Sequence, residues 1–131
     1  MVFNLLEISK IKKAKENLKN VVIESELQKS HRYSDLYNSS IHLKREDLQK
    51  VRSFKIRGAY NKISTLSDKE KKEGVVCSSA GNHAQGVAHS CNKLKISGVI
   101  YMPTITPKQK VAQVKMFGGK FIEIRLHGDT Y

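Results

Sequence analysis

Residues 75–86 read VVCSSAGNHAQG, and this stretch decides the class of fold. The apolar run Val-Val-Cys at residues 75–77 is typical of a strand, and the small residues at positions 78–81 favour a tight turn after it. From there the apolar positions recur at helical spacing, at Ala84, Val87, Ala88, Cys91 and Leu94. A strand, a glycine turn and a helix form the first half of a βαβ unit.

The same alternation continues on the carboxyl side of this stretch. Residues 96–102 predict a second strand and residues 121–124 a third. Between them, Pro107 after Thr106 predicts a helix with proline at its first position, and the glycine pair at 118–119 predicts its end. Strands that alternate with helices require right-handed crossovers. We therefore predict the α/β class, with a parallel sheet, helices on both of its faces, and fewer strands than a complete sheet.

Two helices are predicted on the amino side. Ser9 is the expected N-cap of the first, whose apolar face carries Ile11, Ala14 and Leu18. Ser53 is the expected N-cap of the second, over residues 54–66, whose apolar face carries Ile56, Ala59, Tyr60, Ile63 and Leu66.

Shorter signals fill the remaining sequence. The runs at residues 21–23 and 41–43 predict strands, with a loop or short helix between them. Residues 67–70 read SDKE, which has the form of a capping box, and Gly74 stands where a short helix needs a left-handed stop.

Composition restricts the class of protein. The chain has 131 residues, of which 39% are hydrophobic and 27% charged, and it has only two cysteines. Its longest apolar runs are far shorter than the roughly 18 residues that a membrane span needs. We therefore expect a soluble cytoplasmic protein with free thiols and no membrane partner.

The net charge of +12 favours anionic partners, so a basic nucleic-acid-binding module is one alternative. The basic residues are spread along the chain, no zinc-finger spacing is present, and aromatics do not alternate with the basic residues. A piece of a longer protein, whose acidic residues lie elsewhere, would show the same excess. We expect no nucleic acid as partner.

The turn at residues 78–86 is the first candidate for chemistry. It joins the carboxyl end of a strand to the amino end of a helix, where free N–H groups and the helix dipole attract anions. It matches neither the GxGxxG fingerprint nor the Walker pattern. An ordinary capped βα turn is the alternative interpretation.

Lys55 is the second candidate. It follows the predicted cap Ser53 at the positive end of a helix and stands among other cations, which together disfavour a charged amine. A lysine that condenses with an aldehyde needs this neutral form. A solvated surface lysine is the alternative, and residue spacing alone does not decide between them.

We expect no metal site. Two cysteines and two histidines fall within fifteen positions, but His83 and His89 point about 240° apart on one helix and so diverge.

Longer strings in the sequence resemble threonine dehydratase, the pyridoxal-phosphate-dependent threonine ammonia-lyase family. Residues 43–49 read LKREDLQ, residues 51–60 read VRSFKIRGAY and residues 79–86 read SAGNHAQG, in the order and spacing of that family. The VRSFK form is more similar to the biosynthetic enzymes of isoleucine synthesis than to the catabolic ones. The resemblance implies a partial three-layer α/β/α parallel sheet of the fold-type II pyridoxal-phosphate enzymes, with residues 1–131 forming the amino-terminal part of the catalytic domain.

The resemblance also implies roles for single residues. Lys55 matches the lysine that forms the Schiff base with pyridoxal 5'-phosphate, and Asn82 matches the asparagine that hydrogen-bonds the hydroxyl of the cofactor ring. The loop that grips the substrate carboxylate is matched by Ser79, Ala80, Gly81, Asn82 and His83. The implied substrate is L-threonine, converted to 2-oxobutanoate and ammonia, with L-serine as a second substrate, and the implied full-length protein is a homo-oligomer.

Two departures from the family pattern qualify this expectation. Residues 25–27 read SEL where the family has Thr-Pro-Leu, which removes a rigid φ angle from the loop. The family's glycine-rich loop for the cofactor phosphate, and the residue that faces the pyridine nitrogen, correspond to positions beyond 131. We therefore predict no turnover by this chain alone. Serine racemase, serine dehydratase, and the cysteine and threonine synthases remain alternatives within the fold, and an inert remnant is the alternative outside it.

Overall fold

The structure is a computed structural model that describes residues 6–130. Its centre is a parallel sheet with the strand order β3-β4-β5, formed by β3 (Val75–Ser78), β4 (Gly98–Met102) and β5 (Ile122–Leu126). Val75 pairs with Gly98, and Gly98 pairs in turn with Ile122. The predicted α/β class and parallel sheet are confirmed, with strand ends shifted by one or two residues.

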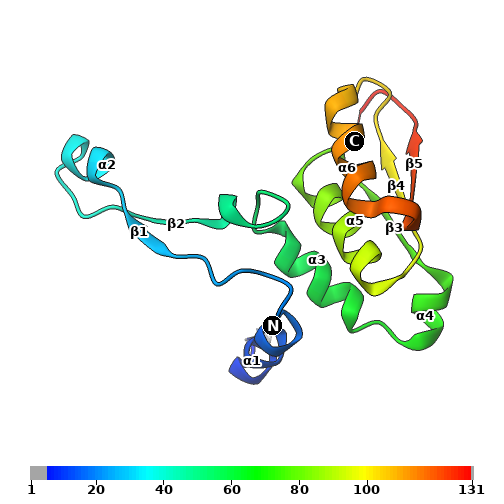
Figure 1. The fold of residues 1–131 in the computed structure, drawn as a ribbon, viewed down its shortest axis with the longest axis horizontal. Coiled ribbons are helices and arrows are strands. Elements are labelled where there is room, and N and C mark those ends of the chain that lie inside the picture. Colours follow the sequence, from blue (N-terminus) through cyan, green and yellow to red (C-terminus); the bar gives the residue numbers. More distant parts are fainter. Residues whose placement is uncertain (1–5, 131) are drawn as a thin grey trace, which may run out of the picture.

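The helices that connect the three strands cover one face of the sheet (Figure 1). The strands are in sequential order, so each right-handed crossover moves the chain in the same direction and places α5 (Asn82–Leu94) and α6 (Lys108–Gly118) on the same side. The third helix, α3 (Lys55–Ser64), packs against α5. On the opposite face of the sheet the side chain of Val76 is 71% exposed. The described residues thus form two layers of a three-layer α/β/α sandwich, and the helices predicted for the second face are not found among residues 6–130.

The core lies between these helices and the sheet. Its fully buried residues include Ile100 and Met102 from β4 and Val114 from α6. The apolar face predicted for α5 packs here, with Ala84, Ala88 and Cys91 completely buried. Helical periodicity therefore identified the buried face of α5 correctly.

The link into the sheet confirms a second local prediction. Helix α4 (Asp68–Glu73) begins with the capping box, in which Ser67 accepts a hydrogen bond from the Glu70 amide and Glu70 accepts one from the Ser67 amide. Gly74 ends the helix at φ 88°, and a Cβ there would lie 2.6 Å from the Ser97 carbonyl oxygen. Only glycine fits this turn.

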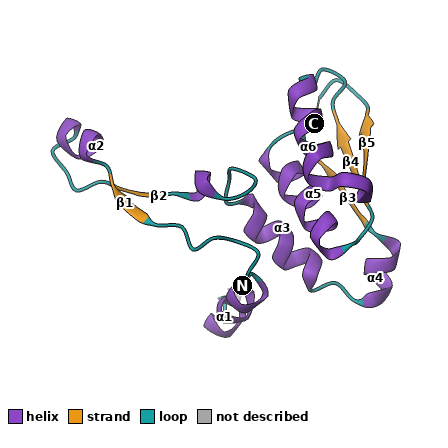
Figure 2. Ribbon diagram, viewed as in Figure 1, coloured by secondary structure: helices purple, strands orange, loops and turns teal. Residues whose placement is uncertain are grey.

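The amino-terminal elements extend away from the sheet (Figures 1 and 2). After α1 (Ile8–Asn17), the strands β1 (Leu27–Lys29) and β2 (His42–Lys44) form an antiparallel ribbon with α2 (His31–Leu36) at its far end. A short 3-10 helix, η1 (Glu46–Leu48), leads from the ribbon to α3. The predicted strand near residues 41–43 and the short helix before it are confirmed, whereas most apolar side chains of the ribbon are exposed.

Several predicted boundaries are wrong. Helix α1 begins at Ile8 after Glu7, and the Ser9 hydroxyl donates to the Glu7 carboxylate instead of capping the helix. Residues 21–23 form no strand, because Val21 packs with Leu18 and Tyr60 in a loop and finds no strand to pair with among the described residues. A short apolar run is equally compatible with both outcomes.

The starts of two further helices differ from prediction by a residue or two. Helix α3 covers residues 55–64, with Phe54 as the N-cap, although the Ser53 hydroxyl still accepts a long hydrogen bond of 3.4 Å from the Lys55 amide. Pro107 precedes the first residue of α6 with ψ 135°, so it is the N-cap and not the first helical residue. Within residues 6–130, no helix is both long and apolar enough to cross a membrane.

Candidate functional site

Lys55 is the first residue of α3 and its side chain is exposed. Its ammonium lies 5.1 Å from the centroid of the Phe54 ring, and it forms no ion pair with any residue from 6 to 130. The amine is therefore free to react with a ligand. The expected desolvation of this amine is not provided by the described residues.

The turn that precedes Lys55 has an unusual backbone. Arg52 has φ 58°, the left-handed conformation, which costs an L-residue about 1 kcal/mol. Its two neighbours, Val51 and Ser53, are both buried. Burial on both sides fixes this turn and with it the position at which α3 and Lys55 begin.

The loop between β3 and α5 carries the predicted carboxylate-binding residues. The Ser79 amide donates to the Tyr101 carbonyl oxygen, and the Ser79 hydroxyl accepts from the Gly81 amide. Gly81 is the N-cap of α5 and offers the helix no side-chain cap, while Asn82 and His83 are exposed in the first turn. A Cβ at Gly81 would meet nothing within 4 Å. Uncapped amides at the positive end of a 13-residue helix, with open space before them, suit a carboxylate.

A close helix contact brings Lys55 and this loop together. A Cβ at Gly86 would lie 3.1 Å from the carbonyl oxygen of Lys55 and 3.3 Å from the amide nitrogen of Ile56. Helix α5 therefore packs directly on the first turn of α3 at a position where only glycine fits without displacement. Asn82 lies about one helical turn before Gly86, since a turn has 3.6 residues. The amino ends of α3 and α5 thus lie close together.

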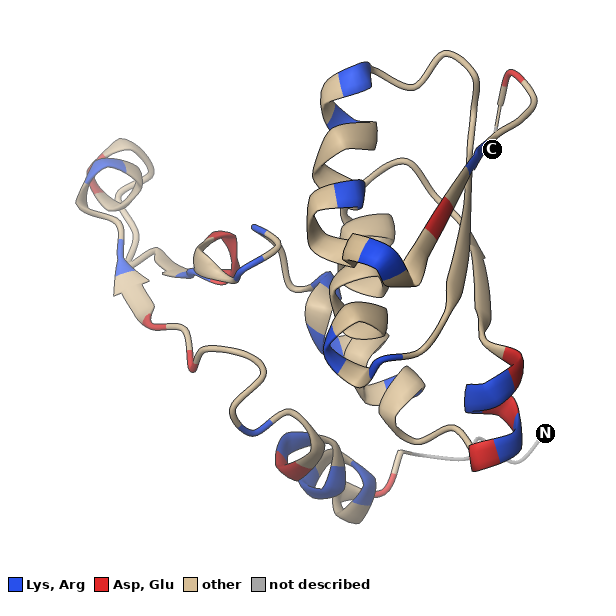
Figure 3. Cartoon of the chain, turned by 45° about the vertical axis from the view of Figure 1, so that its right-hand side comes forward, with Lys and Arg blue, Asp and Glu red and all other residues tan. Residues whose placement is uncertain are grey.

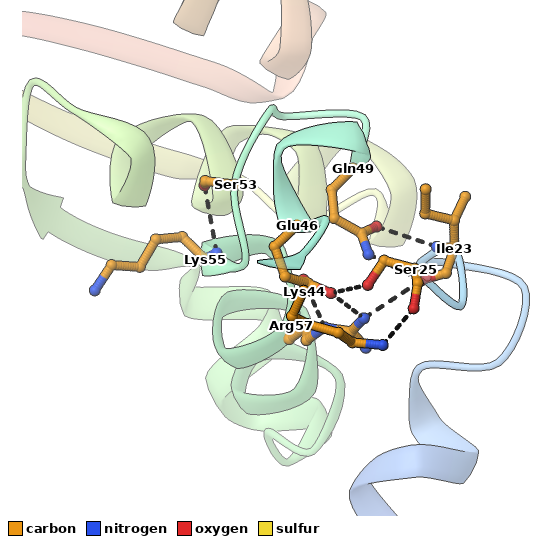
Figure 4. Close-up of polar contacts among 8 residues, drawn as sticks. All are labelled: Ile23, Ser25, Lys44, Glu46, Gln49, Ser53, Lys55 and Arg57. Carbon is orange, nitrogen blue, oxygen red and sulfur yellow. Dashed lines mark hydrogen bonds and ion pairs between the residues drawn. The ribbon is translucent and has the colours of Figure 1, made fainter. Parts of the chain in front are cut away.

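Behind Lys55, a group of polar side chains holds the backbone of residues 23–25, and we call it the clamp (Figure 4). The clamp consists of Lys44, Glu46, Gln49 and Arg57. The Gln49 side chain, 1% exposed, accepts from the Ile23 amide at 3.1 Å and donates to the Ile23 carbonyl at 2.8 Å. The Lys44 ammonium donates to the Ser25 carbonyl oxygen. These bonds fix the loop in which the sequence lacks the expected proline.

Glu46 and Arg57 form the charged centre of the clamp. Arg57 donates through Nη2 to Oε1 of Glu46 at 2.7 Å and through Nε to Oε2 at 2.8 Å. Hydrogen bonding from this guanidinium lowers the pKa of Glu46 to about 2, against the opposing effect of burial and with a further hydrogen bond from the Ser25 hydroxyl. Glu46 is therefore ionised at any ordinary pH.

Sequence reasoning missed the clamp as a unit. Glu46 and Arg57 are 11 positions apart, and Gln49 is 26 positions from Ile23, so no local spacing links them. Two of the three motif strings, residues 43–49 and 51–60, contain the four clamp residues, which is the signal that could have identified them.

His83 and the two cysteines have surroundings of their own. His83 lines a cavity of about 370 Å³ between α3, α4 and β3, a hollow that Lys55 and Asn82 do not border. Burial raises the pKa of Cys77 to about 11 and that of Cys91 to about 12, so both are neutral thiols. In the described part of the chain, no three His, Cys, Asp or Glu side chains stand together as a metal site.

The fold agrees with comparisons to known proteins. Residues 18–131 match the family described as pyridoxal-phosphate dependent enzyme, and the chain belongs to that family. It is 56% identical over 128 residues to the biosynthetic L-threonine dehydratase IlvA of Bacillus subtilis (strain 168), covering 98% of this chain and 30% of that protein.

Solved structures show the same relationship. The processed form of threonine deaminase isoform 2 from Solanum lycopersicum superimposes with a TM-score of 0.80 at 39% identity, over 96% of this chain and 37% of that one. Maize serine racemase superimposes with a TM-score of 0.83 at 33% identity, over 93% and 37% respectively. The chain thus spans about a third of the length of the relatives it matches.

Proposed function

We propose that this chain supplies the amino-terminal part of the active site of a pyridoxal-phosphate-dependent L-threonine dehydratase of the biosynthetic type. The observation that carries the proposal is the contact at Gly86, which packs α5 on the backbone of Lys55 and so brings the start of α3 close to the uncapped start of α5. The 56% identity to a biosynthetic L-threonine dehydratase supports the choice of substrate.

The residues present fit part of the cofactor and the substrate. The exposed Lys55 amine is the attachment point for the cofactor aldehyde, and the Asn82 amide side chain is the hydrogen-bond partner for the ring hydroxyl. The substrate carboxylate binds at the loop formed by Ser79, Ala80, Gly81, Asn82 and His83, where the open backbone at Gly81 lets it approach the free amides. When bound, pyridoxal phosphate supplies an electron sink for the α-carbon.

Lys55 has a second role in this proposal. When not bonded to the cofactor, its amine would accept the proton from the α-carbon of L-threonine. The β-hydroxyl would take up a proton and leave as water, and hydrolysis of the resulting enamine by water would release 2-oxobutanoate and ammonia. The start of α5 holds the carboxylate, which fixes the orientation of the α-carbon relative to that amine. L-Serine would give pyruvate by the same steps.

In this proposal, residues 1–131 form one part of a larger catalytic domain. We propose that the phosphate contacts come from outside these 131 residues, and that the chain alone does not turn over substrate. We also propose that the whole protein is a homo-oligomer in the cytoplasm, with no nucleic-acid partner. Figure 3 shows Lys and Arg spread over several helices and interspersed with acidic residues in α4, which supports the last point.

Amino-acid racemisation is the second candidate function, favoured by the likeness to maize serine racemase. Both reactions begin with removal of the α-proton, so the described residues suit either. The product separates them, because a dehydratase yields 2-oxobutanoate from L-threonine, whereas a racemase returns the D-amino acid.

The test is to mix the purified chain with pyridoxal phosphate, reduce with borohydride and locate the added mass by peptide mapping. We expect saturable labelling of Lys55 that is lost in Lys55→Ala and kept in Lys62→Ala, which removes another exposed lysine of the same helix. Labelling scattered over many lysines would contradict the proposed site. Nucleic-acid binding that falls steeply with salt and ignores Lys55→Ala would support the basic-module alternative instead.

A further inference from the structure

We infer that Glu46 is a positioning residue for Lys55 and acts through Arg57. This inference rests on the proposed function, in which Lys55 reacts with the cofactor, and it assigns a task to a carboxylate that the proposed chemistry does not use. Figure 4 shows the Lys55 side chain directed away from the Glu46–Arg57 pair, so Glu46 does not touch the reacting amine.

The geometry of the pair is well suited to hold a helix in place. Both bonds from the Arg57 guanidinium reach different oxygens of Glu46, at 2.7 and 2.8 Å, which is the bidentate arrangement of a strong charge-assisted contact. The side chains are only 16% exposed for Glu46 and 34% for Arg57. Solvent therefore screens this pair less than an ordinary surface ion pair.

Arg57 transmits this restraint to Lys55 because both belong to the first turn of α3. The side-chain capping of that turn is weak, since its N-cap Phe54 provides no hydrogen bond and the Ser53 hydroxyl accepts from the Lys55 amide only at 3.4 Å. The Arg57 guanidinium, held by Glu46, fixes the side of the turn that faces away from the amine.

Glu46 also connects α3 to the loop before the ribbon. Its Oε1 accepts from the Ser25 hydroxyl, and Arg57 donates through Nη2 to the Ile23 carbonyl at 3.3 Å. One carboxylate thus joins the loop at residues 23–25, η1 and the start of α3. Loss of this carboxylate would loosen the contacts among these three segments next to Lys55.

The experiment measures the Lys55 labelling rate with pyridoxal phosphate and borohydride in this chain, expressed as a ratio to Lys62 on the same helix. Glu46→Gln keeps the size of the side chain and removes its charge, and we expect the ratio to fall about fivefold, the size expected for a partly exposed charge pair. Arg57→Gln should lower the ratio equally, and the double variant should lower it no further, because the two residues act as one unit.

The matched control is Glu123→Gln, which removes the carboxylate of another arginine pair, with Arg125 on β5, at an exposed site. It should leave the ratio unchanged. Ser25→Ala provides a milder variant that keeps the charge pair and removes only one donor to Glu46, with an expected fall of about twofold. Far-UV circular dichroism establishes that each variant is folded.

A second readout needs no cofactor. Amide hydrogen exchange at residues 54–57 should rise in Glu46→Gln and stay unchanged in Glu123→Gln. Labelling ratios in Glu46→Gln equal to the unsubstituted chain, or effects of Glu46→Gln and Arg57→Gln that multiply in the double variant, would overturn the inference. If the unsubstituted chain shows no selective Lys55 label, the proposed function fails, and the exchange measurement alone then decides whether Glu46 positions the start of α3.

Discussion

The sheet layer, residues 55–126, and the amino-terminal segment, residues 6–50, are held together by different interactions. The sheet layer buries most of the apolar core, including residues from α3, α5, β4 and α6. In the amino-terminal segment the buried apolar residues are Leu18 and Val21, whereas its buried polar residues are Ser25, Ser34 and Gln49. Apolar burial dominates the first region and side-chain hydrogen bonds to backbone dominate the second.

This difference has a functional meaning for the candidate site. The site lies where the two regions meet, because Lys55 begins the sheet layer and the clamp ties it to the amino-terminal segment. Close packing of α5 on the Lys55 backbone at Gly86 fixes one side of Lys55, and polar contacts through Arg57 fix the other. Substitutions on the two sides should therefore have effects of different size and kind.

The largest difference is expected between Ile100→Ala and Leu36→Ala. Ile100 is completely buried in the central strand β4, so its truncation should cost about 3–4 kcal/mol of unfolding free energy. Leu36 in α2 is 66% exposed, so its truncation should cost less than about 0.5 kcal/mol. Urea unfolding followed by far-UV circular dichroism measures both. Equal losses would mean that the amino-terminal segment is packed as densely as the sheet layer.

A smaller effect on the free energy of unfolding is expected from alanine at the helical glycine Gly86. The control, alanine at the helical glycine Gly58, should have an effect of the opposite sign. Gly86→Ala places a Cβ 3.1 Å from the Lys55 carbonyl oxygen, and overpacking of this kind costs about 1–3 kcal/mol. Gly58→Ala in α3 meets nothing within 4 Å and should stabilise by about 0.5–1 kcal/mol, since alanine is the better helix former.

The labelling ratio of Lys55 to Lys62 provides a second test of the two glycine substitutions. It should fall in Gly86→Ala, where α5 moves away from α3, and stay constant in Gly58→Ala. Stabilisation of the chain by Gly86→Ala would contradict the close approach of the two helices.

The smallest effect on the free energy of unfolding is expected when acid protonates Glu46 in the clamp. The pKa of Glu46 is lowered to about 2 in the folded chain, below the usual carboxyl value of about 4.3 that applies when it is unfolded. Between these values the unfolded chain binds more protons, so the contribution of Glu46 is fully present above about pH 4.5 and is lost as pH falls towards 2. After allowance for solvent screening, we expect about 1 kcal/mol.

Urea midpoints from pH 6 to pH 2 measure this contribution. The difference between the unsubstituted chain and Glu46→Gln should shrink as the pH falls, whereas Glu123→Gln at the exposed pair should differ little at any pH. A difference that stays constant with pH would show that the ionised carboxylate does not stabilise the clamp.

The sequence by itself determined most of the sheet layer. Helical spacing in α5, the capping box at Ser67 and the stop at Gly74 are local signals. The spacing predicts the buried face of α5, and the other two predict the ends of α4, as observed. The strings around Lys55 and Asn82 likewise identified the family before any geometry was known. These predictions succeed because local preference and tertiary packing favour the same structure there.

Only the tertiary structure decided how the amino-terminal segment is held and how the site is assembled. Residues 21–23 have the composition of a strand, but a strand needs a partner, and Val21 packs against Tyr60 instead. The pairing of Glu46 with Arg57 and the contact of Gly86 with Lys55 join residues far apart in the chain. Spacing along a sequence constrains neighbours on one helix or strand, whereas contacts between elements depend on how those elements pack.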